Sequence, residues 1–335
     1  MNESSPSNRP QSQPPLAAGE HPAAERLAQR HQIAVLIPCR DEARTIGAVI
    51  ADFRKSLPGS DIYVYDNGSS DGTAEHAQTA GALVRHEPLR GKGNVVRRMF
   101  ADVEAEVYVL VDGDDTYDAA SAPALIQALL SGPLDMVNAA RVPVGVGAYR
   151  PGHRLGNRAL TQIVAWVFGD RFSDMLSGYR VMSRRFVKSF PALSSGFEIE
   201  TELTVHALEL GISISEMPAP YRARPEGSAS KLRTVSDGIR ILRLIVTLVK
   251  EERPFSFFAT IAAGLASVSI ILAWPVLLTY LATGLVPRLP TAVLSTGLML
   301  LASLSLACGL ILDSTARARK EMKRLSYLAL PAPHP

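Results

Sequence analysis

Two carboxylates separated by a single glycine follow an apolar run in the first half of the chain. The run VYVLV ends at Val111, and Asp112-Gly113-Asp114 comes directly after it. A strand that ends here would project both acidic side chains into a ligand crevice, and the glycine would let another group approach closely. Hard cations such as Mg²⁺ or Mn²⁺ prefer oxygen ligands and bridge to phosphates. The triplet therefore favours a metal–diphosphate site, with a plain acidic surface turn as the alternative.

Two further polar segments have the composition of ligand-binding turns. The segment DNGSSDGT, residues 66–73, follows an apolar run and precedes a helical pattern. Its oxygens and N–H groups suit a ribose and a base, although Ser70 or Asp71 would also serve as an ordinary helix cap. The segment Gly91-Lys92-Gly93-Asn94 opens another helical pattern, where a lysine suits a phosphate. Its spacing is not that of a P-loop, so it is weak evidence by itself.

Alternating strands and helices are predicted to position these segments. Strands are expected at residues 33–38, 62–66, 82–86, 107–111 and 136–141, and helices at residues 43–57 and 73–80. This alternation predicts an α/β fold with a mostly parallel, Rossmann-like sheet and helices on both of its faces. Ligands of such sheets bind at the carboxyl ends of the strands, where the acidic turns are expected.

The motifs, taken together and in order, resemble the family 2 glycosyltransferases with the GT-A fold. Within that family they are most similar to the polyprenyl-phosphate sugar transferases, the branch that contains dolichol-phosphate mannose synthase. The resemblance covers residues 33–232 and rests on the blocks IPCRDEARTI, YDNGSSDGT, GKGNVVRRM, LVDGDDTYD, AAR, GNR, DMLSGYR and PEGSASKL. It implies a nucleotide-sugar donor, a UDP- or GDP-hexose, and a divalent cation, Mg²⁺ or Mn²⁺.

The resemblance also assigns roles to residues. The nucleotide pocket would be lined by Pro38, Arg40, Asp41, Glu42, Asp66 and Asn67, with Lys92 as a further phosphate-side residue. Asp112 and Asp114 would hold the metal on the diphosphate. The sugar phosphate and the acceptor phosphate would be surrounded by Arg141, Arg180, Arg224, Ser230 and Lys231. The chain departs from the usual family pattern at Arg40-Asp41 and at Asp66-Asn67-Gly68, which leaves the nucleotide base open, whereas Asp-Gly-Asp in place of Asp-Ala-Asp keeps both carboxylates.

Asp174, in the block DMLSGYR, is open to two interpretations. With a hydroxyl acceptor it would be the general base. With a phosphate acceptor it would orient Arg180 or the sugar. The acidic residues Glu198, Glu200 and Glu202 lead into a helical pattern, and either a contact with the sugar or a basic neighbour, or a solvated helix start, would explain them.

Two long uncharged runs near the C-terminus predict a membrane hairpin. Between residues 254 and 312 the only charged residue is Arg288, and each run is long enough for a helix to cross the hydrocarbon core. Basic residues flank both outer ends, so the positive-inside rule places the catalytic domain on the cytoplasmic face of the cytoplasmic membrane. Residues 235–250 carry apolar and basic side chains at helical spacing, which suits a helix in the headgroup layer, with a core-facing helix as the alternative.

Composition excludes several classes of protein. The 335 residues carry 35 Lys and Arg against 32 Asp and Glu, too balanced for a general nucleic-acid binder. The two cysteines, Cys39 and Cys308, exclude a disulfide framework, and a reducing cytosolic setting fits. The expected organisation is a disordered tail (1–30), a GT-A catalytic domain (31–232), an amphipathic juxtamembrane helix (233–253), two transmembrane helices (254–313) and a basic cytoplasmic tail (314–335). Membrane hairpins commonly self-associate, which leaves a homo-oligomer open.

The expected reaction is transfer of a hexose to a polyprenyl phosphate such as undecaprenyl or dolichyl phosphate, for cell-envelope or glycoconjugate assembly, with inversion implied by the resemblance. Because a phosphate monoester has a second pKa of about 6, this acceptor is already an anion and needs positioning rather than a general base. Three alternatives are a family 2 transferase with a hydroxyl acceptor, a polysaccharide synthase, and a non-catalytic membrane scaffold. The synthase is disfavoured because neither Trp166 nor Trp274 follows a Gln-x-x-Arg-Trp pattern.

Overall fold

A computed structural model of the chain describes residues 29–144, 173–225 and 253–332, together with the single residues 27, 243, 246, 247 and 250. Several expectations concern other parts of the chain. The tail up to residue 26, the pair Ser230 and Lys231, and most of the juxtamembrane segment 233–253 lie outside the described residues.

One seven-stranded sheet forms the centre of the catalytic domain, in the order β3-β2-β1-β4-β6-β5-β7. The strands are β1 (Ile33–Cys39), β2 (Asp61–Asp66), β3 (Leu83–His86), β4 (Val107–Leu110), β5 (Met136–Pro143), β6 (Arg180–Ser183) and β7 (Ile214–Tyr221). β6 runs antiparallel to both of its neighbours, and all other pairs are parallel. The predicted α/β fold with a mostly parallel sheet is confirmed.

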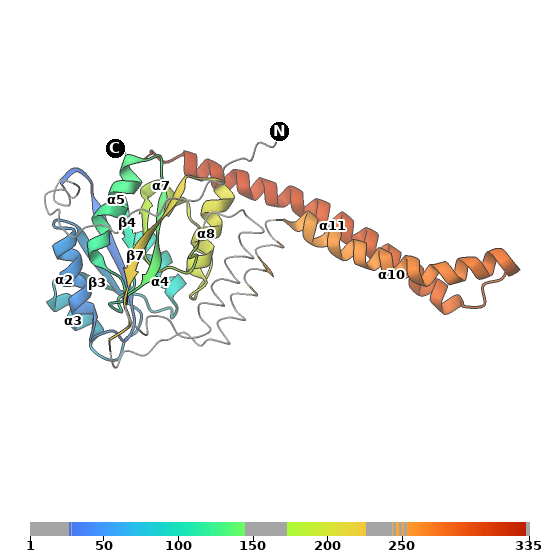
Figure 1. The fold of residues 1–335 in the computed structure, drawn as a ribbon, viewed down its shortest axis with the longest axis horizontal. Coiled ribbons are helices and arrows are strands. Elements are labelled where there is room, and N and C mark those ends of the chain that lie inside the picture. Colours follow the sequence, from blue (N-terminus) through green and yellow to red (C-terminus); the bar gives the residue numbers. More distant parts are fainter. Residues whose placement is uncertain are drawn as a thin grey trace, which may run out of the picture.

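Both faces of the sheet are buried, and the residues of β1 contribute to the core on each face. Ile33, Val35 and Ile37 contribute to one apolar core, and Ala34 and Leu36 contribute to the other. This alternation follows from the two-residue period of a strand. On the first face lie α2 (Ile46–Ser56), α3 (Thr73–Thr79), the 3-10 turn η1 (Ala119–Ser121) and α5 (Ala122–Ser131); on the second lie α4 (Lys92–Asp102), α7 (Arg184–Ser189) and α8 (Ile199–Leu210) (Figure 1).

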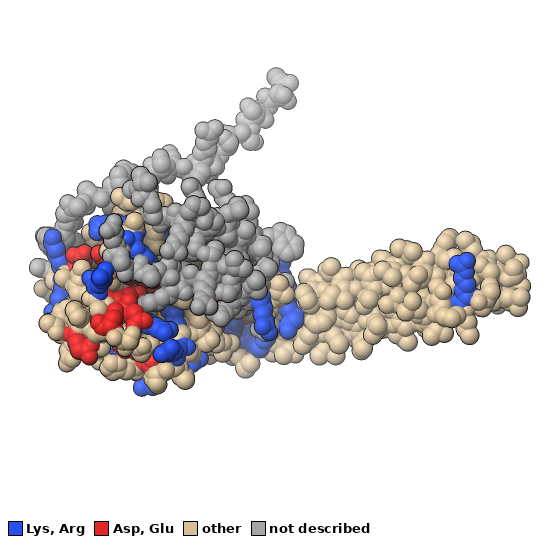
Figure 2. Space-filling model, turned by 90° about the horizontal axis from the view of Figure 1, so that it is seen from below, with Lys and Arg blue, Asp and Glu red and all other residues tan. Residues whose placement is uncertain are grey.

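The C-terminal part forms a helical hairpin that projects away from this domain (Figure 1). It consists of α10 (Pro254–Thr283) and α11 (Leu289–Leu328), joined at Gly284, whose φ of 70° ends α10. Both helices are long and apolar enough to cross a membrane. Only 11% and 17% of their most apolar windows are buried, whereas a core helix of a soluble protein is mostly buried. Figure 2 shows the hairpin as a long uncharged surface with basic groups near both of its ends.

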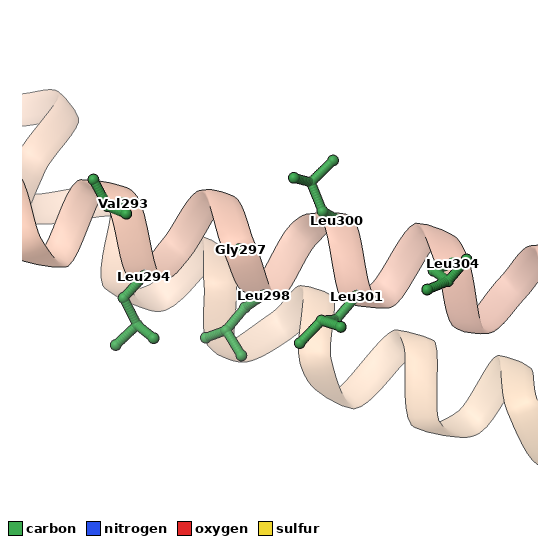
Figure 3. A pocket seen from close by; sticks show the side chains of 7 residues that line it. All are labelled: Val293, Leu294, Gly297, Leu298, Leu300, Leu301 and Leu304. Carbon is green, nitrogen blue, oxygen red and sulfur yellow. The ribbon is translucent and has the colours of Figure 1, made fainter.

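The outer surface of α11 carries a shallow apolar depression of about 520 Å³. Its lining consists of Val293, Leu294, Gly297, Leu298, Leu300, Leu301 and Leu304 (Figure 3). All of these residues belong to the uncharged run of α11 and none belongs to the catalytic domain, so the depression is separate from the polar segments of the sheet.

The end of α11 returns to the catalytic domain. Past the uncharged run the helix continues to Leu328, so much of the segment expected as a basic tail is helical. It packs against α7 and α8, and Tyr327 contacts the core on that side of the sheet. The hairpin therefore contacts the catalytic domain through the C-terminal end of α11, in addition to its covalent connection through the chain that precedes α10.

Candidate active site

The polar segments identified in the sequence meet at one edge of the sheet. β1, β2 and β4 are parallel neighbours, with Cys39 level with Asp66 and Leu36 level with Leu110. The chain segments that follow these three strands therefore emerge side by side at their carboxyl ends.

The turns after β1 and β2 are joined by hydrogen bonds. The Asp41 N–H donates to Ser69 Oγ at 2.8 Å, and the Ser70 N–H donates to Asp41 Oδ1 at 2.9 Å. The Glu42 N–H donates to Thr73 Oγ1 at 2.8 Å. Asp66 joins the same turn by accepting from the Ser69 N–H, Pro38 is level with Tyr65 in the strand pair, and Arg40 lies 3.6 Å from the Asp41 carboxylate. The turns thus hold five of the residues expected at the nucleotide, namely Pro38, Arg40, Asp41, Glu42 and Asp66. Asp41 has a φ of 48°, a left-handed conformation that Asp tolerates better than most residues.

Asn67 forms structural hydrogen bonds at this edge of the sheet. Its Nδ2 donates to the carbonyls of Glu87 and Leu89, both at 2.8 Å, and its Oδ1 accepts from the Gly91 N–H at 2.7 Å. With a side chain only 4% exposed, Asn67 ties the end of β2 to the segment before α4. An aspartate at this position would lack the two N–H donors, so the asparagine makes contacts with Glu87 and Leu89 that an aspartate could not make.

Asp112 lies in a network of opposite charges. Lys92 Nζ lies 2.5 Å from Asp112 Oδ1 and 2.5 Å from Glu200 Oε1. The lysine and Glu200 side chains are 9% and 7% exposed, whereas Asp112 is 29% exposed and faces the solvent in part. Although burial lowers the pKa of Lys92, the two carboxylates raise it well above its ordinary value, so the lysine stays charged.

Two glycines make room for this network. A Cβ at Gly113 would lie 2.5 Å from Glu42 Oε2 and 2.6 Å from Cys39 Sγ. A Cβ at Gly178 would overlap the Asp112 carboxylate. These close contacts explain the glycine between the two aspartates, because it lets the turn after β4 lie against the turn after β1.

Asp114 is the buried member of the pair. Its side chain is 2% exposed, forms an ion pair with Arg224 and accepts a hydrogen bond from Thr116 Oγ1 at 2.6 Å. Burial and the neighbouring Asp112 raise the pKa of Asp114 above its ordinary value, against the opposite effect of Arg224. This ion pair brings Arg224, near the start of the basic segment 222–231, to the acidic pair.

Arg141 and Asp174 form a second ion pair on the same side. Arg141 Nε and one terminal nitrogen donate to the two carboxylate oxygens of Asp174, each at 2.7 Å. The guanidinium also lies 5.5 Å from the ring centre of Tyr221. Asp174 is 5% exposed, and this two-point contact is of the strong, oriented kind. Asp174 therefore orients Arg141. The hydrogen bonds of Arg180 go to main-chain carbonyls and to Met136 Sδ, so they do not support the expectation that Asp174 orients Arg180, and a contact of Asp174 with the sugar stays a prediction.

Arg180 lies inside the domain, away from the position that was expected for it beside the sugar phosphate. Its side chain is fully buried, and it donates to the carbonyls of Ser177, Met175 and Glu200 at 3.1, 2.7 and 2.9 Å. Burial lowers its pKa to about 10. A side chain held by main-chain carbonyls inside the domain does not surround a sugar phosphate directly. It instead fastens the DMLSGYR segment to the start of α8, which carries Glu200.

The glycine-rich start of α4 packs against another segment of the chain. The Gly93 N–H donates to the carbonyls of Ser195 and Gly196, both at 3.1 Å, and a Cβ at Gly93 would overlap the Ser194 carbonyl. The helix start is thus covered by residues 194–196, which Glu202 holds through the N–H groups of Leu193 and Ser194. Its glycines permit close packing of two chain segments, and only Lys92 extends from it towards Asp112.

The donor chemistry at Asp112 and Asp114 fits a divalent cation. Within residues 29–144, 173–225 and 253–332, no group of three or more His, Cys, Asp or Glu residues is arranged to hold a metal. Mg²⁺, however, is usually bound by one or two carboxylates and completed by substrate phosphates and water. Two carboxylates on one turn, one of them reachable from solvent, meet that description.

Two further residues contribute to this edge of the sheet. For Glu200 a basic neighbour was one of the expected alternatives, and the fold identifies that neighbour as Lys92. The Tyr117 hydroxyl accepts from the Gly178 N–H at 2.8 Å and thereby supports the glycine against which Asp112 packs. Tyr117 belongs to the motif LVDGDDTYD, so its position in the motif was the available signal.

Comparison with known proteins gives concordant results. The sequence model of the family described as Glycosyl transferase family 2 matches residues 34–189. Glycosyltransferase AglJ of Haloferax volcanii is 34% identical over 236 residues, which cover 70% of this chain and 77% of the relative. A dolichyl-phosphate hexose transferase of the same organism is 28% identical over 221 residues, 66% of this chain and 95% of the relative.

The fold is also found among solved structures. Glucosyl-3-phosphoglycerate synthase from Mycobacterium tuberculosis, crystallised with Mn²⁺, uridine diphosphate and phosphoglyceric acid, superimposes with a TM-score of 0.56. The identity is 23%, and the match covers 71% of this chain and 83% of that chain. At this level of identity the likeness concerns the fold.

Proposed function

Because this chain belongs to the family 2 glycosyltransferases, we propose that it is a membrane-bound inverting transferase that moves a hexose from a UDP- or GDP-sugar to a polyprenyl phosphate. The observation that carries the proposal is the ion pair between Asp114 and Arg224. It joins the acidic turn after β4 to the basic segment that precedes the apolar hairpin. A bilayer-held anionic acceptor would approach the donor diphosphate from that segment.

The residues at the edge of the sheet suit the leaving group. A divalent cation held by Asp112 and Asp114 would stabilise the charge that develops on the nucleoside diphosphate. Lys92 and Arg224 form ion pairs with these carboxylates, and both cations would turn to phosphate oxygens when a donor binds. The turns after β1 and β2 would hold the nucleoside, with Asp41, Glu42 and Asp66 as its polar contacts.

Transfer needs one nucleophile and one leaving group. An oxygen of the acceptor phosphate forms a bond to the anomeric carbon, and the bond from that carbon to the β-phosphate oxygen breaks. The electron pair leaves with the nucleoside diphosphate, and attack from the opposite side inverts the anomeric centre. Because the acceptor is already an anion at neutral pH, no proton has to be removed.

The state of Asp174 favours this acceptor over a hydroxyl. A general base needs an accessible carboxylate, whereas Asp174 is 5% exposed and both of its oxygens accept from Arg141. Arg141, held in this orientation, is suited to a phosphate oxygen. The names of two compared proteins lend support: a dolichyl-phosphate hexose transferase among the relatives, and a structural neighbour crystallised with Mn²⁺ and uridine diphosphate.

The hairpin and its charges suggest where the reaction occurs. Two apolar helices flanked by basic residues fit an anchor in the cytoplasmic membrane with the catalytic domain on the cytoplasmic side. The lipid-linked sugar would then serve cell-envelope or glycoconjugate assembly.

The proposal is tested with the purified full chain in detergent or liposomes. A panel of UDP- and GDP-sugars is incubated with undecaprenyl phosphate and Mg²⁺ or Mn²⁺, and lipid products are separated by thin-layer chromatography. We expect one donor to yield a metal-dependent glycosylated lipid. Metal-dependent release of free sugar without a lipid product would instead support a transferase with another acceptor, and no reaction with any donor would support the scaffold alternative.

A further inference from the structure

The last turns of α11 are held on the catalytic domain by side chains that the proposed chemistry does not use. Tyr327 Oη donates to Asp135 Oδ2 at 2.5 Å, and the Arg185 guanidinium carbon lies 4.7 Å from the centre of the Tyr327 ring. One helical turn earlier, Lys323 Nζ lies 2.7 Å from Glu209 Oε2. Three elements therefore meet here, since Asp135 precedes β5, Arg185 lies on α7 and Glu209 lies on α8.

The carboxylates that receive α11 are buried. Asp135 is 1% exposed and also accepts from Ser183 Oγ at 2.8 Å and from Arg185 Nε at 2.5 Å. Glu209 is 5% exposed. A buried carboxylate is costly unless it is paired and hydrogen-bonded, so contacts of this kind hold a fixed arrangement. The docking of α11 is thus a specific, partly buried contact rather than loose packing of a basic tail.

Helix α8 connects this contact to the candidate active site. Glu200 in its first turn holds Lys92, the cation on Asp112, and Glu209 in its last turn holds Lys323. The nine residue steps from Glu200 to Glu209 span about 14 Å of helix. One rigid element therefore links the end of the membrane hairpin to the acidic pair (Figure 1).

We propose that the docked end of α11 is a strut that sets the position of the active site relative to the bilayer, with Lys323 and Tyr327 as positioning residues for transfer to a membrane-held acceptor. The uncharged run of α11 ends at Leu312, and the helix rises about 22 Å from there to Tyr327. While both ends are fixed, this length holds the domain at one distance from the membrane surface. This inference rests on the proposed function, because the distance matters only when the acceptor is anchored in the bilayer.

Charge reversal tests the strut. Lys323→Glu breaks the contact with Glu209, and the double variant Lys323→Glu with Glu209→Lys restores it in the opposite sense. Lys320→Glu is the matched control, because Lys320 is exposed on the same helix. Each full-length protein is assayed with undecaprenyl phosphate in liposomes and with geranyl phosphate in solution. Amide hydrogen exchange of residues 316–328 reports docking independently of activity.

We expect Lys323→Glu to raise exchange in residues 316–328 and to lower transfer to undecaprenyl phosphate by about tenfold, since misplacement of reacting groups by an ångström costs up to about 100-fold. Transfer to geranyl phosphate should not change, and the double variant should recover most of the lost transfer. Tyr327→Phe, which removes only the hydroxyl, should give a smaller effect in the same direction.

Three results would overturn the strut. They are unchanged exchange in Lys323→Glu, an equal loss with both acceptors, and unchanged transfer to undecaprenyl phosphate despite faster exchange. Absence of transfer to either acceptor by the unaltered chain would instead overturn the proposed function, and the role of the strut with it. The two failures are therefore told apart by the unaltered protein.

Discussion

The catalytic domain and the helical hairpin differ in the size of the side chains that they bury. In the domain many fully buried side chains are large, such as Phe53, Tyr108 and Phe186. In the hairpin the buried positions are almost all small, and the large apolar side chains face outward. Those buried in α10 are Pro254, Ala262 and Ser269, and those in α11 are Ser295, Ala302, Gly309 and Ala316. The domain therefore shields its large apolar side chains from solvent, whereas the hairpin exposes them, as expected of helices that could cross a membrane.

The buried positions of α11 recur every seven residues, from Ser295 to Ala316. This spacing produces a left-handed crossing of two helices, and small residues at it let backbones approach closely. Polar groups in the hairpin bond across the same seam: Ser269 Oγ donates to the Ser295 carbonyl at 2.7 Å, and Ser305 Oγ donates to the Phe258 carbonyl at 3.0 Å. In the domain, by contrast, charged groups gather at the strand ends.

The largest effect is expected at those strand ends. Asp112→Asn removes one negative charge from the proposed metal–diphosphate site while it keeps the size of the side chain. Because the cation that Asp112 would help to hold stabilises the charge on the leaving diphosphate, we expect kcat to fall by about 10²–10³-fold. Asp115→Asn is the matched control, because Asp115 directly follows Asp114 but is not assigned to the site. Its φ of 57° is one that Asn tolerates. Equal activity of the two variants in lipid-phosphate transfer would remove the special role of Asp112.

A large-to-small substitution separates the two regions by stability. Phe186→Ala removes a fully buried ring from the domain and should lower the free energy of unfolding by about 3–5 kcal/mol. Leu300→Ala, at a position 67% exposed in the hairpin, should change it by less than about 0.5 kcal/mol. Denaturation in the same detergent measures both. A cost at Leu300 as large as that at Phe186 would mean that this face of α11 is covered by protein.

A small-to-large substitution tests the seam between the two hairpin helices, where the buried residues are small. Ala302→Leu places extra volume in the seam between α10 and α11, where Ala302 is 4% exposed, and overpacking of this kind costs about 1–3 kcal/mol. Ala263→Leu, on the exposed side of α10, serves as the control. Steric trapping or SDS denaturation of the hairpin provides the measurement. If the two variants are equally stable, the seam is not the packing surface.

The smallest expected effect is a pH dependence in the domain. His206 is 3% exposed between the rings of Phe186 and Phe190, and neither ring nitrogen has a hydrogen-bond partner among the described residues. Burial, and then the charge of Lys323, lower its pKa to about 3. The folded chain therefore keeps His206 neutral where the unfolded chain already binds a proton, so stability falls as the pH drops from 6.5 towards 3.

At about pH 5 this difference amounts to about 2 kcal/mol for a fully expressed shift. His206→Leu should remove that share of the loss of stability between pH 7 and pH 5, and thermal unfolding at both pH values measures it. His76→Leu, at an exposed position, is the surface control measured in the same way. An unchanged pH dependence in His206→Leu would show that His206 is protonated or hydrated in the folded chain.

The sequence predicts the elements whose signal is local. Apolar runs ended by turn residues located the first five strands, and length with absence of charge located both hairpin helices. β6 and β7 escaped prediction because neither alternates clearly: the four residues of β6 are all buried, and β7 carries Pro218 and Pro220. Pro is tolerated in β7 because the strand forms the edge of the sheet.

The candidate site divides in the same way. Motif order identified Asp112, Asp114 and Arg224, and the fold brings them together. It did not distinguish Arg180, which is buried, from Arg141, which is held at the site, because arginines at a core and at a ligand look alike in sequence. Partners far along the chain, such as Glu200 for Lys92 and Asp135 for Tyr327, follow only from the tertiary structure.

The proposed nucleophile is a lipid phosphate in the bilayer, which needs no general base. A comparison of undecaprenyl phosphate with undecaprenol in identical liposomes, with the active donor and metal, tests this role. We expect glycosylated undecaprenyl phosphate and no glycosylated undecaprenol. Transfer to undecaprenol at an equal or higher rate would contradict the account, because it would require a base that activates a hydroxyl.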